Sequence, residues 1–329
     1  MHTHLHRNAL PQLQRNDFLT DGGIETTLIF HEGFELPLFA AFTLLKSERG
    51  RQALNRYYGK YLALAEEHNT GFILESATWR ASRVWGEPLG YSAQDLATAN
   101  RQAIELLHGL REGFASEQPV VVSGCVGPMG DGYAPSEMLD AAQSADYHAE
   151  QIETFDTAGV DMVTAITMTH TGEALGIANA CADRGLPLAI SFTVELDGRL
   201  PSGQPLMDAI REVDGDACTP PAYYMINCAH PEHFMPVLQQ RASAAARIYG
   251  MRCNASRMSH EELDNADTLD EGNPSELAEL HAQVKDYLPN LRIFGGCCGT
   301  DDRHVGAIAH ACLGGAACAA PPRTAAAGS

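Results

Sequence analysis

The sequence predicts a single (β/α)₈ barrel. Eight short apolar runs alternate with longer amphipathic stretches along 329 residues, and one such barrel typically needs about 250 residues. The runs are rich in Val, Ile, Phe and Tyr and close with Gly, Pro or Ser, which is typical of buried parallel strands. A doubly wound open sheet is the alternative arrangement of the same alternation.

The expected strands are short and are separated by helical patterns. They cover residues 18–22, 71–75, 119–125, 160–166, 187–193, 222–228, 247–253 and 291–296, of which the seventh has the weakest pattern. Apolar residues near a 3.6-residue period predict helices at 47–68, 93–114, 137–158, 172–184 and 275–288. The run Asn273-Pro274-Ser275 marks the start of the last of these helices.

No linker divides the chain, so we expect one barrel domain over residues 17–315. An N-terminal extension, 1–16, precedes it, and its histidines (His2, His4 and His6) are expected in a disordered tail. An Ala- and Pro-rich tail, 316–329, follows it and is expected to be flexible. The acidic segment 256–273 is long for a loop, and such loops are usually functional or mobile.

Composition limits the partners of the protein. With 22 Lys and Arg against 42 Asp and Glu, the net charge is −20, which argues against binding nucleic acid or an anionic membrane surface. No apolar stretch approaches the roughly 20 residues that span a bilayer, and the start of the chain lacks the apolar core of a signal peptide. These observations predict a cytoplasmic protein with small-molecule partners. A homo-oligomer is compatible with the pattern.

The cysteines point to metal chemistry. Nine cysteines, an odd number without a signal peptide, are not typical of a disulfide framework. Active sites of barrels lie at the carboxyl ends of the strands, where Cys228 ends the sixth run and Cys297-Cys298 follow the eighth. Side chains alternate along a strand, but the glycines that flank the Cys-Cys pair allow both cysteines to face inward. Three cysteines with one open position suit a catalytic zinc.

Three thiolates make a zinc site that favours sulfur chemistry. Such a site would bind a substrate thiol as the fourth ligand and lower its pKa from about 8.5. The resulting thiolate attacks an electrophilic carbon well and has no proton to lose. We therefore expect alkyl transfer to sulfur rather than hydrolysis.

The motifs resemble those of the zinc-dependent homocysteine S-methyltransferases, a family of (β/α)₈ barrels. The resemblance runs from about residue 18 to 313 and rests on Asp21-Gly22-Gly23, Asn227-Cys228 and Gly295-Gly296-Cys297-Cys298-Gly299. It implies that Cys228, Cys297 and Cys298 bind Zn2+. It also implies that Asp21 and Gly22 contact the amino-acid part of a thiol acceptor, homocysteine, which a sulfonium or ammonium donor (S-methylmethionine-, betaine- or SAM-like) methylates to methionine. We expect Asn227 and Thr167 among the substrate-binding residues.

The sequence departs from the family after the fourth strand. There the family carries a Glu that holds the homocysteine amino group, and this chain has Ile166-Thr167. Loss of a charged contact costs roughly 1.5–3 kcal/mol, so either another acid replaces it or the acceptor is a different thiol or selenol. Glu75, at the end of the second strand, is the expected replacement, unless it forms a structural salt bridge with Arg80 or Arg83.

Aromatic and basic residues follow the second strand. Ser76, Trp79, Arg80 and Trp85 lie in one loop that contains both tryptophans of the chain. Their rings could hold a cationic methyl donor by cation–π contact, and the arginines would then favour a zwitterionic donor. The alternative is that the tryptophans pack the loop onto the barrel.

Two other hypotheses remain open at this stage. The zinc could be structural, closed by a fourth ligand such as Cys253, in a non-catalytic metabolite-binding protein. Alternatively, Cys297-Cys298 could act as a redox pair, although such a ring is strained and the chain lacks Cys-X-X-Cys.

Overall fold

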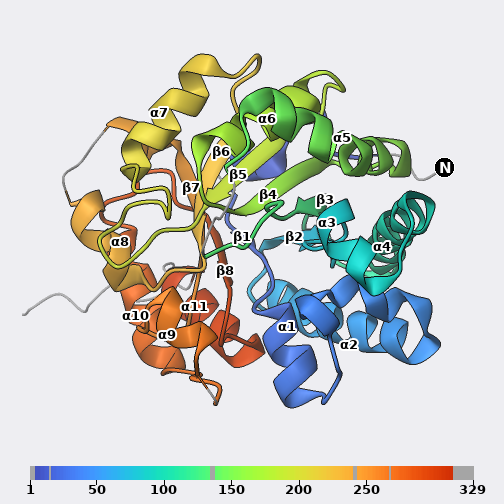
Figure 1. Ribbon diagram of the computed structural model, residues 1–329. Helices are drawn as coiled ribbons and strands as arrows, with labels where there is room; N and C mark the ends of the chain where they lie inside the picture. Colours follow the sequence, from blue (N-terminus) through green and yellow to red (C-terminus); the bar gives the residue numbers. More distant parts are fainter. Residues whose placement is uncertain (1–3, 15, 134–137, 240–242, 267, 314–329) are drawn as a thin grey trace, which may run out of the picture.

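The structure, a computed structural model, is a closed barrel of eight parallel strands surrounded by helices (Figure 1). It describes residues 4–14, 16–133, 138–239, 243–266 and 268–313. Each strand pairs with its neighbours in chain order, and β8 closes the barrel on β1. The strands are β1 Phe18–Leu19, β2 Gly71–Glu75, β3 Val120–Val126, β4 Met162–Met168, β5 Leu188–Phe192, β6 Tyr223–Asn227, β7 Ile248–Cys253 and β8 Ile293–Gly296. The predicted TIM-type barrel is confirmed, and the doubly wound sheet is excluded.

The helices follow the strands around the outside of the barrel (Figure 1). They are α1 Ile24–Thr26, α2 Glu48–Glu67, α3 Arg83–Gly86, α4 Ala93–Gly113, α5 Ala141–Ala158, α6 Thr171–Ala182, α7 Leu206–Asp216, α8 Pro231–Leu238, α9 His260–Asp264, α10 Pro274–Val284 and α11 Asp302–Leu313. The five predicted helices correspond to α2, α4, α5, α6 and α10, and the sequence patterns missed the other six. The long acidic segment contains α9 and is therefore not wholly a loop.

Local sequence explains where the long helices begin and end. Helix α4 starts with a capping box in which Ser92 accepts a hydrogen bond from the backbone of Asp95, whose carboxylate accepts one in return. Asp140 and Gln143 form the same motif at the start of α5, which ends at Gly159 in the left-handed conformation. The buried strands and the inner faces of these helices enclose the main apolar core.

The N-terminal segment closes the lower end of the barrel, where the strands begin. Leu10 packs in a second apolar cluster inside the barrel with Phe18 and Met162. The backbone N–H groups of Leu5 and His6 donate hydrogen bonds to Asp161 at 2.6 and 2.8 Å. The expectation of a disordered tail is therefore wrong for His6, because a buried carboxylate holds the backbone there; His2 lies outside the described residues.

Candidate metal and substrate site

Three cysteine sulfurs lie together at the carboxyl ends of β6 and β8. Those of Cys228, Cys297 and Cys298 all lie within 4.8 Å of one another. Cys228 and Cys297 are paired as a disulfide, with Cα atoms 5.4 Å apart, and the Cys228 and Cys298 sulfurs are 3.9 Å apart. The disulfide joins residues 69 positions apart rather than the vicinal pair, so the geometry does not favour the redox hypothesis based on Cys297-Cys298.

Unusual backbone conformations bring the three sulfurs together. Cys228 itself adopts a positive φ of 52°, and Gly299 after the Cys-Cys pair has a φ of 78°. A side chain at Gly296 would place its Cβ 2.0 Å from the hydroxyl of Thr300. The turn around Cys297-Cys298 therefore depends on glycine, as its sequence suggests. The positive φ of Cys228 also helps to bring the sulfurs together, and the sequence did not indicate it.

The cysteine cluster fits a soft metal with an open position. Among the described residues, no fourth Cys, His or carboxylate completes the group. Cys253, the fourth ligand that a closed structural site would need, is fully buried and lies outside the group. The donor set thus suits zinc that keeps a position for a substrate thiol.

Tyr133 and His260 cover the cysteine cluster. The Tyr133 hydroxyl lies 3.2 Å from the Cys298 sulfur and 3.5 Å from that of Cys228. Its ring stacks on His260 at a centroid distance of 4.1 Å, and His260 Nε2 contacts the Cys228 carbonyl oxygen at 2.6 Å. The sequence patterns did not indicate either residue; the glycine-rich stretch 124–132 before Tyr133 is a local signal for a loop at this end of the barrel.

Asn227 connects the cysteine cluster to the end of β4. Its Oδ1 accepts hydrogen bonds from the Thr167 N–H at 3.0 Å and the Ser191 hydroxyl at 2.7 Å. Its Nδ2 donates to the Thr167 hydroxyl at 2.8 Å and lies 4.0 Å from the Cys297 sulfur. Thr167 has a φ of 65°, so Asn227 supports a strained residue at the mouth of the barrel. Ile166, beside it, is buried and apolar.

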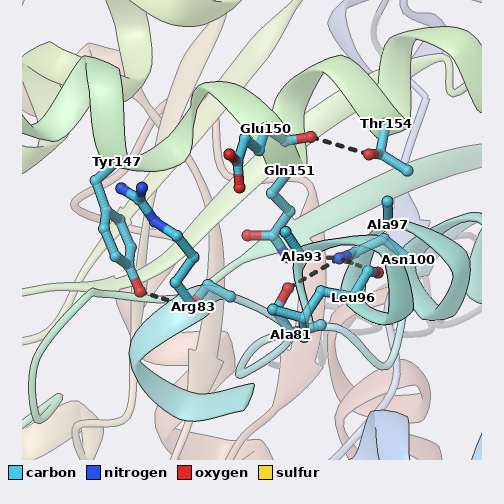
Figure 2. A pocket seen from close by; sticks show the side chains of 11 residues that line it. Ala81, Arg83, Ala93, Leu96, Ala97, Asn100, Tyr147, Glu150, Gln151 and Thr154 are labelled. Atoms are coloured by element: carbon cyan, nitrogen blue, oxygen red, sulfur yellow. Dashed lines mark hydrogen bonds between the residues drawn. The ribbon is translucent and has the colours of Figure 1, made fainter. Parts of the chain in front are cut away.

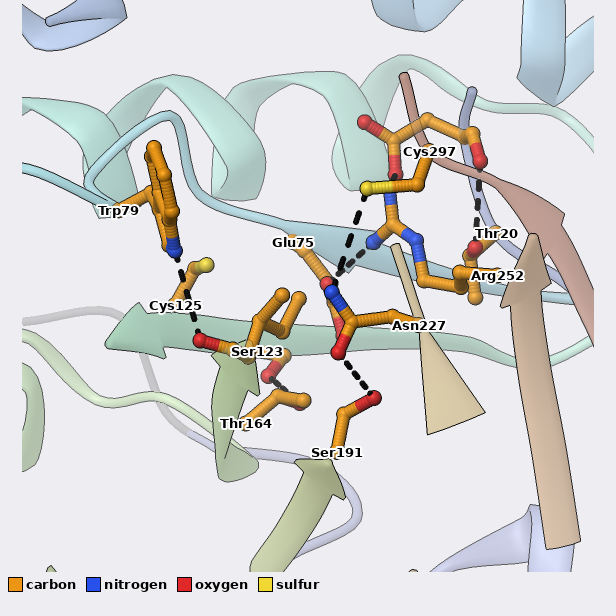
Figure 3. Close-up of polar contacts among 12 residues, drawn as sticks. Thr20, Glu75, Trp79, Ser123, Cys125, Thr164, Ser191, Asn227, Arg252 and Cys297 are labelled. Atoms are coloured by element: carbon orange, nitrogen blue, oxygen red, sulfur yellow. Dashed lines mark hydrogen bonds and ion pairs between the residues drawn. The ribbon is translucent and has the colours of Figure 1, made fainter. Parts of the chain in front are cut away.

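A buried charge cluster lies beneath these residues. Arg252, on β7, pairs with Glu75 on β2 and with Asp21, to which its guanidinium approaches at 2.7 Å. Figure 3 shows the Glu75–Arg252 pair beside Asn227 and Cys297. The alternative of a pair with Arg80 or Arg83 is wrong, because Arg252 reaches Glu75 from inside the barrel. Arg252 was not among the predicted site residues, although a charged residue within a buried strand was a usable signal.

Burial perturbs the acids of this cluster. It raises the pKa of Glu75 to about 7, against the opposing effect of Arg252. Burial also raises the pKa of Asp21, again opposed by Arg252. The Tyr57 hydroxyl donates hydrogen bonds to Asp21 at 2.8 Å and to the Gly22 carbonyl oxygen at 2.9 Å. Gly22 itself leaves no space for a side chain, because a Cβ there would lie 2.7 Å from Tyr61.

The loop after β2 is held from both sides. Ser76 is buried, and its hydroxyl accepts a hydrogen bond from the Cys125 N–H at 2.9 Å. Behind the loop, α4 and α5 border a small pocket (Figure 2), in which Asn100 donates to the Ala81 carbonyl oxygen at 2.8 Å and Tyr147 to Ser82 at 2.9 Å. The loop is therefore a rigid support for the residues that it carries.

The aromatic rings of this loop already contact a cation of the chain. The Arg80 guanidinium lies 3.6 Å from the ring centroid of Trp85 and 4.7 Å from that of Trp79. Trp85 also donates to the Pro128 carbonyl oxygen at 3.2 Å, and Trp79 to the Ile166 carbonyl oxygen at 3.4 Å. Both tryptophans thus pack the loop onto the barrel, as the packing alternative expects, and Arg80 is the cation that their rings contact.

The sequence matches one protein family. Together with the barrel and its cluster of cysteines, this match identifies the protein as a methyltransferase. A family model described as homocysteine S-methyltransferase matches residues 18–312. The chain belongs to the homocysteine S-methyltransferase family.

Individual relatives are distant in sequence. Homocysteine S-methyltransferase 3 of Arabidopsis thaliana is 23% identical over 320 residues, which cover 88% of each chain. The oxidized form of the homocysteine methyltransferase MmuM from Escherichia coli is 20% identical, with a TM-score of 0.74 over 92% of this chain and 97% of that one. The metallated form of MmuM is also 20% identical, with a TM-score of 0.72 over 91% and 98% of the two chains. At this identity the structural likenesses show the shared fold. No described helix of this chain has the length and apolar character needed to cross a bilayer.

Proposed function

We propose that this enzyme transfers a methyl group from a small sulfonium or ammonium donor to the thiol of homocysteine, which gives methionine. The observation that carries the proposal is the cluster of three cysteine sulfurs at the mouth of the barrel. The name of the relative from Arabidopsis thaliana supports homocysteine as the acceptor.

We propose that Cys228, Cys297 and Cys298 hold zinc as thiolates. Zinc with three thiolate ligands and an open position lowers the pKa of a thiol that binds there and maintains the thiolate at neutral pH. The metallated structure of MmuM supports a metal in this fold. Because all three sulfurs must be reduced, we expect the enzyme to act in a reducing compartment such as the cytoplasm.

The residues of the chain bind and orient the two reactants. Tyr133 and His260 cover the cysteines and would exclude water from the reacting sulfur. Asn227 fixes the mouth of the barrel beside Cys297. Arg80 presents a guanidinium over two tryptophan rings, which suits the carboxylate of a zwitterionic donor.

The proposed reaction needs no base at the moment of transfer. The acceptor sulfur forms a bond to the methyl carbon while the bond between that carbon and the donor breaks. A sulfonium donor leaves as a neutral thioether and an ammonium donor as a neutral amine. The proton of the acceptor thiol passes to solvent.

Metal analysis and calorimetry under reducing conditions test the proposal. We expect one zinc per chain, zinc-dependent binding of L-homocysteine, and formation of methionine from at least one of S-methylmethionine, betaine or S-adenosylmethionine. Cys298→Ala should lose bound zinc and at least 100-fold of the activity. Cys218→Ala, at an exposed free cysteine, is the matched control and should change neither.

Two results would count against the proposal. Retention of both zinc and activity by Cys298→Ala would show that Cys298 is not a ligand of the metal and would contradict the proposed centre of three cysteines. One zinc per chain without binding of L-homocysteine would mean that Ile166 belongs to the pocket of a different thiol or selenol acceptor.

A further inference from the structure

The buried charge cluster beneath the mouth of the barrel gathers three carboxyl groups against two guanidinium groups, those of Arg252 and Arg80. Asp21, Glu25 and Glu75 provide three carboxyl groups, and Arg252 approaches all of them: it pairs directly with Asp21 and Glu75 and lies within electrostatic reach of Glu25. The three carboxyl groups and Arg252 also influence the buried thiol of Cys125, which places them in one environment. A cation from outside the protein would balance the third carboxyl group.

Asp21 already has two partners within the chain, although its Oδ1, which pairs with Arg252, makes no hydrogen bond of good geometry among the described residues. One of its oxygens lies 2.7 Å from the Arg252 guanidinium, and the other accepts a hydrogen bond from the Tyr57 hydroxyl at 2.8 Å. Glu75 is only half satisfied, because its Oε2 contacts Arg252 while its fully buried Oε1 has no hydrogen-bond partner among the described residues. An unpartnered buried carboxylate oxygen is costly, and a bound N–H donor would relieve that cost.

Glu25 lies beside this cluster and next to the turn that carries Cys297 and Cys298. Its neighbour Thr26 accepts a hydrogen bond from the Gly299 N–H at 3.0 Å. On the other side, a Cβ at Gly23 would lie 2.6 Å from the Cys297 carbonyl oxygen. The α1 segment and Gly23 before it are therefore in contact with the two residues that flank Cys298, so the backbone of Glu25 lies beside the turn that carries the cysteines.

Glu25 is a partly buried residue whose carboxyl group is not engaged by another side chain of the described residues. Within the described part of the chain it makes no ion pair and no hydrogen bond to another side chain. Burial, reinforced by Asp21, raises its pKa to about 7, while Arg80 and Arg252 oppose that rise. A carboxyl group in this state gains most from a ligand that brings its own positive charge.

We propose that Glu25 binds the ammonium group of the amino-acid acceptor, with the unpartnered oxygen of Glu75 as the second acceptor of its N–H bonds. The inference rests on the proposed function, because it takes the thiol to come from an amino acid whose sulfur reaches the cysteine cluster. Ile166 is buried and uncharged, and Glu173 is engaged by His148 at 2.9 Å and by the Met129 N–H at 2.7 Å. Among the described residues, Glu25 is thus an acid beside this cluster that has no side-chain partner of its own.

A pair of thiols that differ only in the ammonium group tests this assignment. The zinc-loaded enzyme is titrated calorimetrically with L-homocysteine and with 4-sulfanylbutanoate, which has the same chain and carboxylate but no amino group. For Glu25→Gln we expect the affinity for L-homocysteine to fall about 10- to 100-fold. The affinity for 4-sulfanylbutanoate should stay within twofold of the wild type.

The matched control is Glu35→Gln, which removes the same charge from an exposed glutamate ten residues along the chain. It should leave the preference between the two thiols unchanged. The zinc content should be equal in the wild type, Glu25→Gln and Glu35→Gln. If Glu25→Gln keeps the wild-type preference for L-homocysteine, or if it lowers the affinity for both thiols equally, the assignment of Glu25 is wrong. The proposed function still stands in that case. If the zinc-loaded wild type binds neither thiol, the proposed function fails and this inference fails with it.

Discussion

The side chain of Asn227 holds Thr167 through two hydrogen bonds, one from the Thr167 N–H at 3.0 Å and one to its hydroxyl at 2.8 Å. Thr167 needs this support because its φ of 65° is unfavourable for a β-branched residue. Asn227 also immediately precedes Cys228. One amide thus fixes the backbone at the carboxyl end of β4 and at the residue immediately before Cys228.

Removal of this amide should destabilise the protein and the proposed metal site together. In Asn227→Ala the Thr167 N–H and the Ser191 hydroxyl lose a buried acceptor, and we expect the free energy of unfolding to fall by about 2–4 kcal/mol. Zinc affinity should fall as well. Urea unfolding and a competitive zinc titration measure the two effects. Ser191→Ala removes only one of the contacts, so an equal loss in both variants would contradict the assignment.

Oxidation should compete with metal binding. The disulfide between Cys228 and Cys297 uses two of the three sulfurs of the cluster, and a disulfide sulfur is no longer a thiolate ligand. We expect air-oxidised protein to have two fewer titratable thiols and to bind less than a tenth of a zinc per chain. Treatment with a phosphine reductant should restore one zinc. Full zinc content in the oxidised protein would contradict the prediction.

The buried pair between Arg252 and Glu75 should show strong coupling. Arg252→Met leaves two buried carboxyl groups without their cation, and loss of one partner of a buried pair costs roughly 3–5 kcal/mol. Arg252→Met combined with Glu75→Gln should recover part of that loss, because one uncompensated charge is also removed. A double-mutant cycle by urea unfolding measures the coupling. Simple additivity of the two changes would contradict a direct pair.

His281 should make the protein less stable in acid. Burial lowers its pKa to about 4, and its Nδ1 contacts the Leu277 carbonyl oxygen at 2.7 Å. Between roughly pH 6.5 and 4 the unfolded chain binds a proton at this residue and the folded chain does not. The free energy of unfolding therefore falls as the pH falls through this range.

The slope of stability against pH gives the measurement for His281. His281→Leu should reduce this slope between pH 4 and 6.5 by up to about 1.4 kcal/mol per pH unit, which corresponds to one proton. His310→Gln, at an exposed histidine, is the control. An unchanged slope in His281→Leu would show that another group is responsible for acid sensitivity.

The sequence predicted the strands of the barrel better than its helices. Eight buried parallel strands are continuous apolar runs and remain recognisable without any partner. Helix α8 is only eight residues long and contains Pro231 and Pro236, which conceal its pattern. Helix α1 has three residues and owes its shape to contacts with the cysteine turn.

The candidate site was predictable only where its residues form motifs. The glycine-flanked Cys297-Cys298 pair and the end of the sixth strand were visible as local patterns. The contact between Arg252 and Glu75 joins residues 177 positions apart, and no periodicity or spacing encodes such a contact. For the same reason the sequence pattern points to Arg80 or Arg83, in the adjacent loop, as the partner of Glu75.

The N-terminal segment has a practical consequence for the use of this enzyme. Residues near Leu10 seal the end of the barrel where the strands begin, whereas the cysteines lie at the end where the strands finish. A support attached ahead of this segment would therefore anchor the molecule by its closed base. The end that carries the cysteines would face the surrounding liquid, which is the orientation required if that end is the catalytic one on a bead or an electrode.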